Sequence, residues 1–113
     1  MNEQSPMFSF HNVINSLENN RDIPLLNGNH YHYIEVSSTR INGQHFQNAI
    51  HYRISDRNSK RITFELINAV YVHLLNSGRL PTKATMCTLF HHELCSRPCN
   101  YTVACSIAQR FIN

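Results

Sequence analysis

The stretch HYHYIEVSSTRINGQHFQNAIHYRIS, residues 30–55, decides the fold. It contains two runs of aromatic and β-branched residues on either side of Asn42-Gly43. Asn-Gly is the strongest short-range signal for a β-hairpin, because both residues tolerate a positive φ. Apolar side chains alternate along each run, with Ile34 and Val36 on the first and Ile50, Tyr52 and Ile54 on the second. The stretch therefore predicts a β-hairpin with one buried face.

Upstream of the hairpin, the segment SPMFSFHNVINSLENN has the period of an amphipathic helix. Ser5 is a suitable N-cap, and Pro6 fits the first helical position. The apolar residues that share one helical face are Met7, Phe10, Ile14 and Leu17. We expect a helix over residues 6–18, followed by a short edge strand in DIPLL, where Pro24 is tolerated.

Downstream, the polar and basic stretch SDRNSKR, residues 55–61, is interpreted as a connector to a helical C-terminal half. The first helix of that half has Thr63 as its N-cap and stops at Gly78. The second begins after its cap, Thr82, and Asn100 is expected to cap the third.

These elements define an α+β chain with an N-terminal helix, a β-hairpin or three short strands, and three C-terminal helices. The 113 residues have the size of one domain. Residues 1–57 would form its helix and hairpin part, and residues 62–113 its helical part.

Positive charge is concentrated in the middle of the chain. The formal net charge is +3, but residues 40–61 contain five basic residues and a single acid, Asp56. Such a segment is either a phosphate-contacting stripe or a solvated face. The candidate nucleic-acid-binding residues are Arg40, Arg53, Arg57, Lys60, Arg61 and Lys83. The aromatic run from His30 to Tyr33 offers either rings that stack on bases or ordinary cross-strand partners.

No apolar run approaches the roughly 20 residues that span a bilayer, and the first ten residues do not have the pattern of a signal peptide. We therefore expect a cytoplasmic protein without a membrane partner. Thiols stay reduced in that compartment, so the four cysteines are interpreted as thiols or metal ligands before disulfides.

Three of the cysteines cluster with two histidines in TMCTLFHHELCSRPCN, residues 85–100. Cys87, His91 and Cys95 recur every four residues, so one helical face presents all three, and Cys99 follows just beyond. The ligand types suit zinc, but paired cysteines of structural zinc sites usually lie closer together on a turn. We interpret these cysteines as packing residues, with zinc or a reactive thiol as the alternative, and expect no other cofactor.

The sequence contains no recognisable catalytic signature. Its three glycines make no phosphate loop, and neither a G-x-S-x-G elbow nor an H-E-x-x-H pair occurs. A Cys/His nucleophile pair would find no orienting acid beyond Glu93, whose side chain diverges from that of His92 on a helix. We therefore expect a binding protein and not an enzyme.

The last helix, in YTVACSIAQRFI, has a narrow apolar seam suited to packing against another helix. Its candidate interface residues are Val103, Ile107 and Phe111, and the expected partner is a second copy or another protein. Three consecutive helices also raise the possibility of a helix-turn-helix, although the only basic residue of the last one, Arg110, lies near its end.

The segment ELINAVYVHLLNSGRLPTKATMCTLFHHEL, followed by YTVACSIAQRFI, resembles the AriR/YmgB family of enterobacterial biofilm and acid-resistance regulators. The shared pattern is an apolar helix ending in a glycine, a polar link with a lysine, Leu-rich turns and a final helix. Its residues here are Leu74, Leu75, Gly78, Leu80, Lys83, Leu89 and Leu94. The resemblance covers residues 62–113 and implies a helical homodimer that regulates transcription through protein contacts, with DNA binding suggested.

The sequence thus suggests a small bacterial regulatory protein, linked to stress or biofilm formation, that binds a protein partner and possesses a candidate surface for DNA. The first alternative is a zinc or thiol module that uses Cys87, His91, Cys95 and Cys99. The second is a non-catalytic inhibitor from a prophage or another mobile element.

Overall fold

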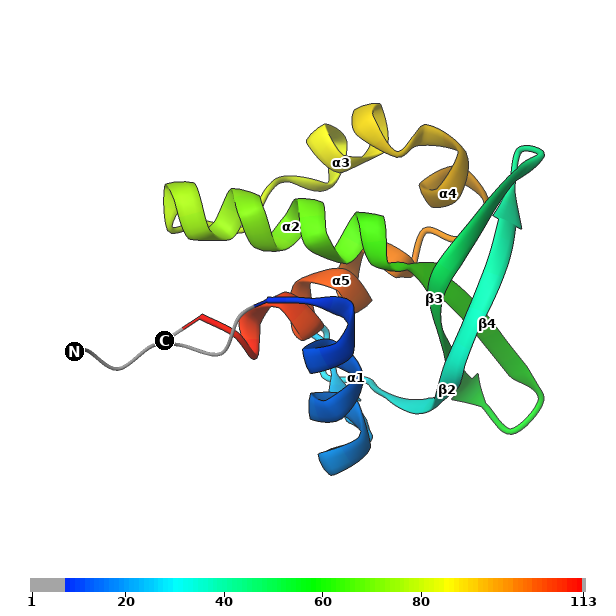
Figure 1. The fold of residues 1–113 in the computed structure, drawn as a ribbon. Coiled ribbons are helices and arrows are strands. Elements are labelled where there is room, and N and C mark those ends of the chain that lie inside the picture. Colours follow the sequence, from blue (N-terminus) through cyan, green and yellow to red (C-terminus); the bar gives the residue numbers. More distant parts are fainter. Residues whose placement is uncertain (1–7, 113) are drawn as a thin grey trace.

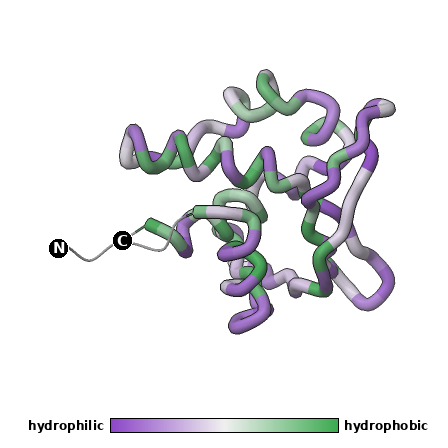
Figure 2. The backbone as a smooth tube through the Cα atoms, viewed as in Figure 1, coloured by the Kyte–Doolittle hydropathy of each residue, from purple (hydrophilic) through white to green (hydrophobic). Residues whose placement is uncertain are grey.

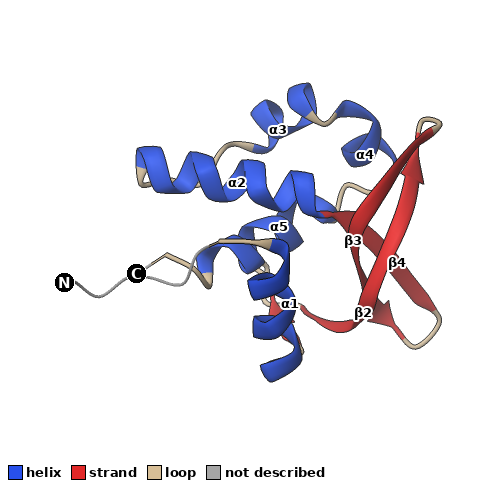
Figure 3. Ribbon diagram, viewed as in Figure 1, coloured by secondary structure: helices blue, strands red, loops and turns tan. Residues whose placement is uncertain are grey.

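The computed structural model describes residues 8–112. Within this range the chain forms an N-terminal helix, a four-stranded antiparallel sheet and then four helices (Figure 1, Figure 3). The elements are α1 (Phe10–Asn19), β1 (Asp22–Pro24), β2 (His30–Ile41), β3 (Gln44–Ser55), β4 (Asn58–Thr63), α2 (Phe64–Ser77), α3 (Lys83–Leu89), α4 (His91–Ser96) and α5 (Asn100–Gln109). The architecture is α+β, as the sequence predicts, with an additional strand and an additional helix.

Strands β2 and β3 occupy the two runs that predict the hairpin. Asn42 and Gly43 form its turn with φ values of 50° and 81°, and Ile41 pairs with Gln44 across it. A positive φ at both turn positions is the type I′ geometry, which matches the right-handed twist of the strands. The hairpin prediction is confirmed.

The buried face of β2 differs from the prediction. Val36 is 47% exposed, whereas Tyr33 is 1% exposed. The register of β2 against β3 shifts between Tyr33 and Glu35, which leaves Ile34 as an extra residue. Because such a bulge moves the two-residue alternation by one position, Val36 shares its face with Tyr33 and not with Ile34, and it pairs with the buried Ile50 although it is itself exposed.

The polar stretch 55–61 is part of the sheet, so its interpretation as a connector is wrong. A two-residue turn follows β3, and β4 then pairs antiparallel with β3. Only Ile62 and Thr63 at the end of β4 are buried, which is too short an apolar pattern to reveal a strand. The predicted edge strand with Pro24 is confirmed as β1, and the sheet order is β1-β2-β3-β4.

Helix α1 starts later than predicted. Phe8 and Ser9 are not helical, and the Ser9 side chain caps the helix by accepting a hydrogen bond from Asn12 N at 3.1 Å. The predicted cap Ser5, together with Pro6 and Met7, lies outside the described residues.

The capping predictions for α2 and α3 are confirmed. The Thr63 hydroxyl accepts from Leu66 N at 3.2 Å, and Gly78 ends α2 with a φ of 76°. The Thr82 hydroxyl accepts from Thr85 N at 3.1 Å. Both threonines satisfy backbone donors that the first helical turn leaves without partners.

The second C-terminal helix is broken in two, contrary to the prediction. Phe90, with a φ of −125° and a ψ of 51°, separates α3 from α4. No glycine or proline marks this position, so the local sequence does not signal the break. Asn100 is not a cap either, because it is the first residue of α5 and its side chain is fully buried among other partners.

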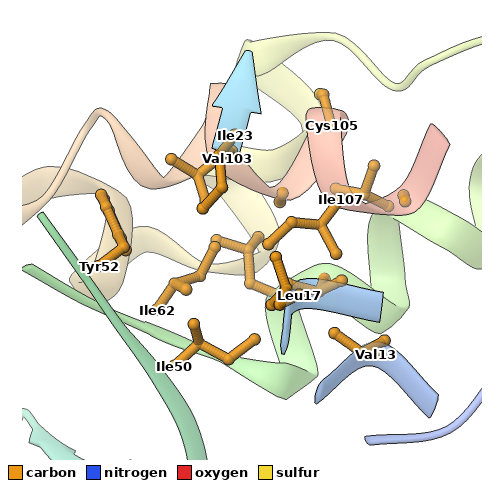
Figure 4. Packing of buried hydrophobic residues seen from close by; sticks show 14 of the residues in the cluster. Val13, Leu17, Ile23, Ile50, Tyr52, Ile62, Val103, Cys105 and Ile107 are labelled. Carbon is orange, nitrogen blue, oxygen red and sulfur yellow. The ribbon is translucent and has the colours of Figure 1, made fainter. Parts of the chain in front are cut away.

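The core lies between one face of the sheet and helices α1, α2 and α5 (Figure 4). Ile50, Tyr52 and Ile62 enter it from the sheet, and Leu17 and Ile107 enter it from the helices. In contrast, the turn between β3 and β4 is hydrophilic (Figure 2). Along residues 8–112, no helix has both the length and the hydrophobicity of a membrane span.

Candidate nucleic-acid interface

The second face of the sheet is polar near the β3–β4 turn. Residues that pair directly across neighbouring strands point to the same face of a sheet. The register therefore places six side chains together, opposite to the buried Ile50 and Tyr52. We call this surface the open face, and its residues are His32, Glu35, His51, Arg53, Ser59 and Arg61.

A cavity of about 300 Å³ opens at the β4 side of the open face. We call it the basic cavity, and it is lined by His51, Ser59, Lys60, Arg61 and Arg97. Three of these side chains are cationic at neutral pH. No acidic residue of the described chain is among those that line it.

Arg97 reaches the basic cavity from the link between α4 and α5, and the backbone of β4 holds it there. Its Nη1 donates to the Arg61 carbonyl oxygen at 2.8 Å. This bond uses one of the five N–H donors of the guanidinium group, so the group keeps donors for a ligand. A planar fork of donors suits the oxygens of a phosphate.

His51 lines the cavity from β3, where it pairs with Glu35 on β2 and Arg61 on β4. Its Nε2 is 2.8 Å from the Ser59 hydroxyl. Its Nδ1 is 3.5 Å from a Glu35 carboxylate oxygen, without hydrogen-bond geometry. Glu35, and Asp22 where β1 pairs with His32, place carboxylates on this side of the sheet and offset part of its positive charge.

A buried polar network fixes the segment that carries Arg97. Glu93 is 4% exposed, and its carboxyl group accepts three hydrogen bonds. The donors are Thr63 N at 3.0 Å, the Thr63 hydroxyl at 2.7 Å and Asn100 Nδ2 at 2.9 Å. Because an unpartnered buried carboxyl is costly, this set of donors stabilises the packing of α4 against the β4–α2 junction.

The network continues to β3 through Asn100. Its Nδ2 also donates to the Arg61 carbonyl oxygen at 3.0 Å, and its Oδ1 accepts from the Tyr52 hydroxyl. That hydroxyl lies 3.2 Å from Cys99 Sγ. Burial, followed by the contact with Cys99, raises the pKa of Tyr52 above its ordinary value.

Four of the six predicted nucleic-acid residues lie at the same end of the sheet. Arg53 and Arg61 are on the open face, and Lys60 lines the basic cavity. Arg57 is in the adjoining β3–β4 turn.

Arg40 and Lys83 lie elsewhere. Arg40 is near the tip of the β2–β3 hairpin, where its Nη1 donates to the Gly43 carbonyl oxygen at 3.2 Å. Lys83 is the first residue of α3, in the helical half of the molecule (Figure 1). Neither residue joins the basic cavity.

The tyrosines at the start of β2 are engaged within the chain, which favours the alternative that they are ordinary cross-strand partners. The Tyr31 ring stacks on Tyr52 with a centroid distance of 5.7 Å. Tyr33 is buried, and the Arg21 guanidinium lies 5.1 Å from its ring centroid. Of the aromatic run, His32 is on the open face, and His30 points to the same side of the sheet.

The four candidate zinc ligands are not gathered at one point. Cys95 Sγ lies 3.6 Å from both ring nitrogens of His91. Cys87 instead packs against the core, and Cys99 faces the buried network. Among residues 8–112, no group of three or more His, Cys, Asp or Glu side chains is arranged to hold a metal ion.

The apolar seam of α5 is occupied within the same chain. Val103 and Ile107 are 0% exposed and belong to the core. The Phe111 ring packs edge-on against Phe8 at a centroid distance of 5.2 Å. The seam is therefore not a surface for a second copy, because the core of its own chain already covers it. With Asn100 buried as well, α5 is not free to enter a DNA groove.

A second cavity, of about 450 Å³, lies between the tip of the β2–β3 hairpin, the start of α2 and the junction of α3 and α4. We call it the hairpin cavity. Asn42 and His92 meet beside it, with 3.2 Å between Nδ2 and Nε2. This contact joins residues that are 50 positions apart.

The sequence-based prediction did not include His51, Ser59 or Arg97. His51 and Ser59 come together only when β4 pairs with β3, and the sequence alone indicates a connector where β4 lies. Arg97 has no local signal, because tertiary packing alone brings it to the β4 edge.

Comparisons of the chain with protein-family models, with curated proteins and with solved structures found no match. The resemblance to the AriR/YmgB family therefore stays a prediction. The functional proposal rests on the geometry of the chain's own residues.

Proposed function

We propose that this chain is a small cytoplasmic regulatory protein that binds nucleic acid through the open face of its sheet. The basic cavity is the observation that carries the proposal, because cationic side chains from two distant segments line it without an acidic neighbour in the lining. Arg53 on the same face and Arg57 in the adjoining turn extend the positive surface. Contacts to phosphates dominate nucleic-acid affinity.

A backbone phosphate fits the chemistry of the basic cavity. Arg61 and Arg97 would provide paired N–H donors and charge. Ser59 on β4 and His51 on β3 have shorter side chains and would add polar contacts to the same phosphate. Because phosphate contacts position a duplex without reading its sequence, we expect weak sequence preference.

Double-stranded nucleic acid is the form that this surface favours. Proteins that bind single strands without sequence preference stack the bases on exposed aromatic rings. The tyrosines at the start of β2, Tyr31 and Tyr33, already contact other parts of the chain. The open face is better equipped to contact a regularly spaced row of phosphates.

Fluorescence anisotropy of a labelled DNA duplex across a salt series tests this function. With three to four cations on phosphates, the logarithm of the association constant should fall against the logarithm of salt with a slope of roughly −3 to −4. The matching single strand should bind less tightly. No binding at low salt, or binding with a slope near zero, would contradict the proposal.

The contact between Cys95 and His91 is the observation that bears on the zinc or thiol alternative. Elemental analysis of the purified chain, with thermal unfolding in the presence and absence of a chelator, tests it. Stoichiometric zinc and a lower melting temperature in chelator would favour that function. A protein partner and an inhibitor role stay predictions.

A further inference from the structure

The hairpin cavity differs in chemistry from the basic cavity. Ile41 and Phe46 from the hairpin, together with Leu89 and Phe90 from the α3–α4 junction, give it an apolar wall. Leu89 is 64% exposed, so a large apolar side chain meets water beside the cavity. A volume of about 450 Å³ falls within the size range of small-molecule sites, which combine apolar walls with a few polar groups.

The cavity is bounded by segments that hydrogen bonds hold in place. The contact between Asn42 and His92 joins the hairpin tip to α4. The bonds from Thr63 and Asn100 to Glu93 fix α4 on its other side. A site with such bounded walls suits a compact ligand better than a continuous polypeptide.

The charges around the hairpin cavity favour a cation. Its lining contains carboxylates but neither lysine nor arginine, although the chain has a net charge of +3. The Glu93 carboxyl group already accepts three hydrogen bonds. Glu65, in the first turn of α2, is exposed and has no side-chain hydrogen bond or ion pair with another residue in the range 8–112. Glu65 is therefore the carboxylate that can pair with a ligand.

We infer that the hairpin cavity binds a small organic amine, with the apolar body of the ligand against Phe46 and Leu89 and its ammonium group facing Glu65. An aromatic body suits the wall best, because the rings of Phe46 and Phe90 offer offset-stacked or edge-on contacts. An anionic ligand of the same shape meets the Glu65 carboxylate and binds less tightly. This site shares no lining residue with the basic cavity.

Three indoles of matched shape test the inference. Tryptamine, tryptophol and indole-3-propionate present an ammonium, a hydroxyl and a carboxylate on similar two-carbon arms. Each is titrated into the 15N-labelled full chain while amide chemical shifts are recorded. We expect saturable shifts from tryptamine at hairpin and α3–α4 residues that line the cavity, and an affinity at least about tenfold above that of indole-3-propionate.

The variant Glu65→Gln separates the charge from the apolar contact. It should lower tryptamine affinity to about that of tryptophol, while tryptophol binding stays unchanged. Glu18→Gln, at an exposed position on α1, is the matched control and should leave both affinities unchanged. The inference is overturned if no indole shifts the cavity residues, if indole-3-propionate binds as tightly as tryptamine, or if Glu65→Gln has no effect. None of these outcomes bears on nucleic-acid binding, because Arg53, Arg61 and Arg97 do not line this cavity.

Discussion

Glu93 and Thr63 are 30 residues apart in the chain and share two hydrogen bonds. The Thr63 backbone N–H donates to Oε2 at 3.0 Å, and its hydroxyl donates to Oε1 at 2.7 Å. Thr63 is both the last residue of β4 and the N-cap of α2. This pairing therefore attaches α4 to the point where the sheet meets the helical half, and it helps to hold Arg97 beside Arg61.

Replacement of Glu93 by alanine should be among the most destabilising changes in the chain. It leaves buried donors on Thr63 and Asn100 without their acceptor. We expect the free energy of unfolding to fall by about 3–5 kcal/mol in urea titrations. Glu18→Ala, at an exposed position, should change it by no more than about 0.5 kcal/mol. A loss below about 1 kcal/mol for Glu93→Ala would show that the network contributes little.

The pKa of Tyr52 predicts a loss of stability in alkaline solution. Burial raises this pKa above the 10.0 of an ordinary tyrosine, so the unfolded chain releases the phenolic proton first. The stabilisation that arises from the raised pKa of Tyr52 is present in full below pH 10 and decreases as the pH rises above that value. Other tyrosines with raised pKa values add to this loss of stability. The effect of Tyr52 is therefore measured as the difference between the wild type and Tyr52→Phe.

Tyr52→Phe should therefore show a weaker alkaline loss than the wild type, by up to about 1.4 kcal/mol per pH unit above pH 10. At neutral pH it should be less stable by about 1–3 kcal/mol, because Asn100 Oδ1 loses its donor. Urea titrations between pH 8 and 11 measure both effects. Tyr71→Phe is the control, and an identical slope for Tyr52→Phe and the wild type would refute this account of Tyr52.

The position of Ile107 predicts a core residue and not a subunit contact. Ile107→Ala should lower the free energy of unfolding by about 2–5 kcal/mol, and the loss should not depend on protein concentration. Leu75→Ala is the apolar control, since Leu75 is 58% exposed on α2. Equilibrium unfolding at several protein concentrations is the measurement. A loss that grows on dilution would instead place Ile107 at an interface between copies.

Local sequence signals predicted the elements whose ends depend on one or two residues. Asn42-Gly43, Thr63 and Gly78 each have a chemistry that specifies a turn or a helix end, and the structure confirms them. The strand β4 was missed because its polar residues form a strand through pairing with β3, and that pairing is a tertiary effect. The break at Phe90 is likewise not predicted by local sequence, because no residue with special backbone preferences marks it.

The candidate interface was predictable only in part, for a related reason. The basic residues of 40–61 were visible as a cluster of charge, but the sequence does not say which of them share a face. Pairing of β3 with β4 brings Arg53 and Arg61 together and sends Arg40 to the far end of the hairpin. Arg97 joins them from 36 residues beyond Arg61, a distance over which sequence periodicity carries no information.

Two double variants of equal charge test the central claim most directly. Arg53→Gln/Arg61→Gln removes two cations from the open face, whereas Arg79→Gln/Lys83→Gln removes two exposed cations outside it. In anisotropy titrations with the same DNA duplex across salt, the first variant should lose at least about tenfold in affinity, and its salt slope should be smaller by about 2. The second should stay within about twofold of the wild type. Equal losses in the two variants would mean that net charge alone attracts the duplex, and would contradict binding at the open face.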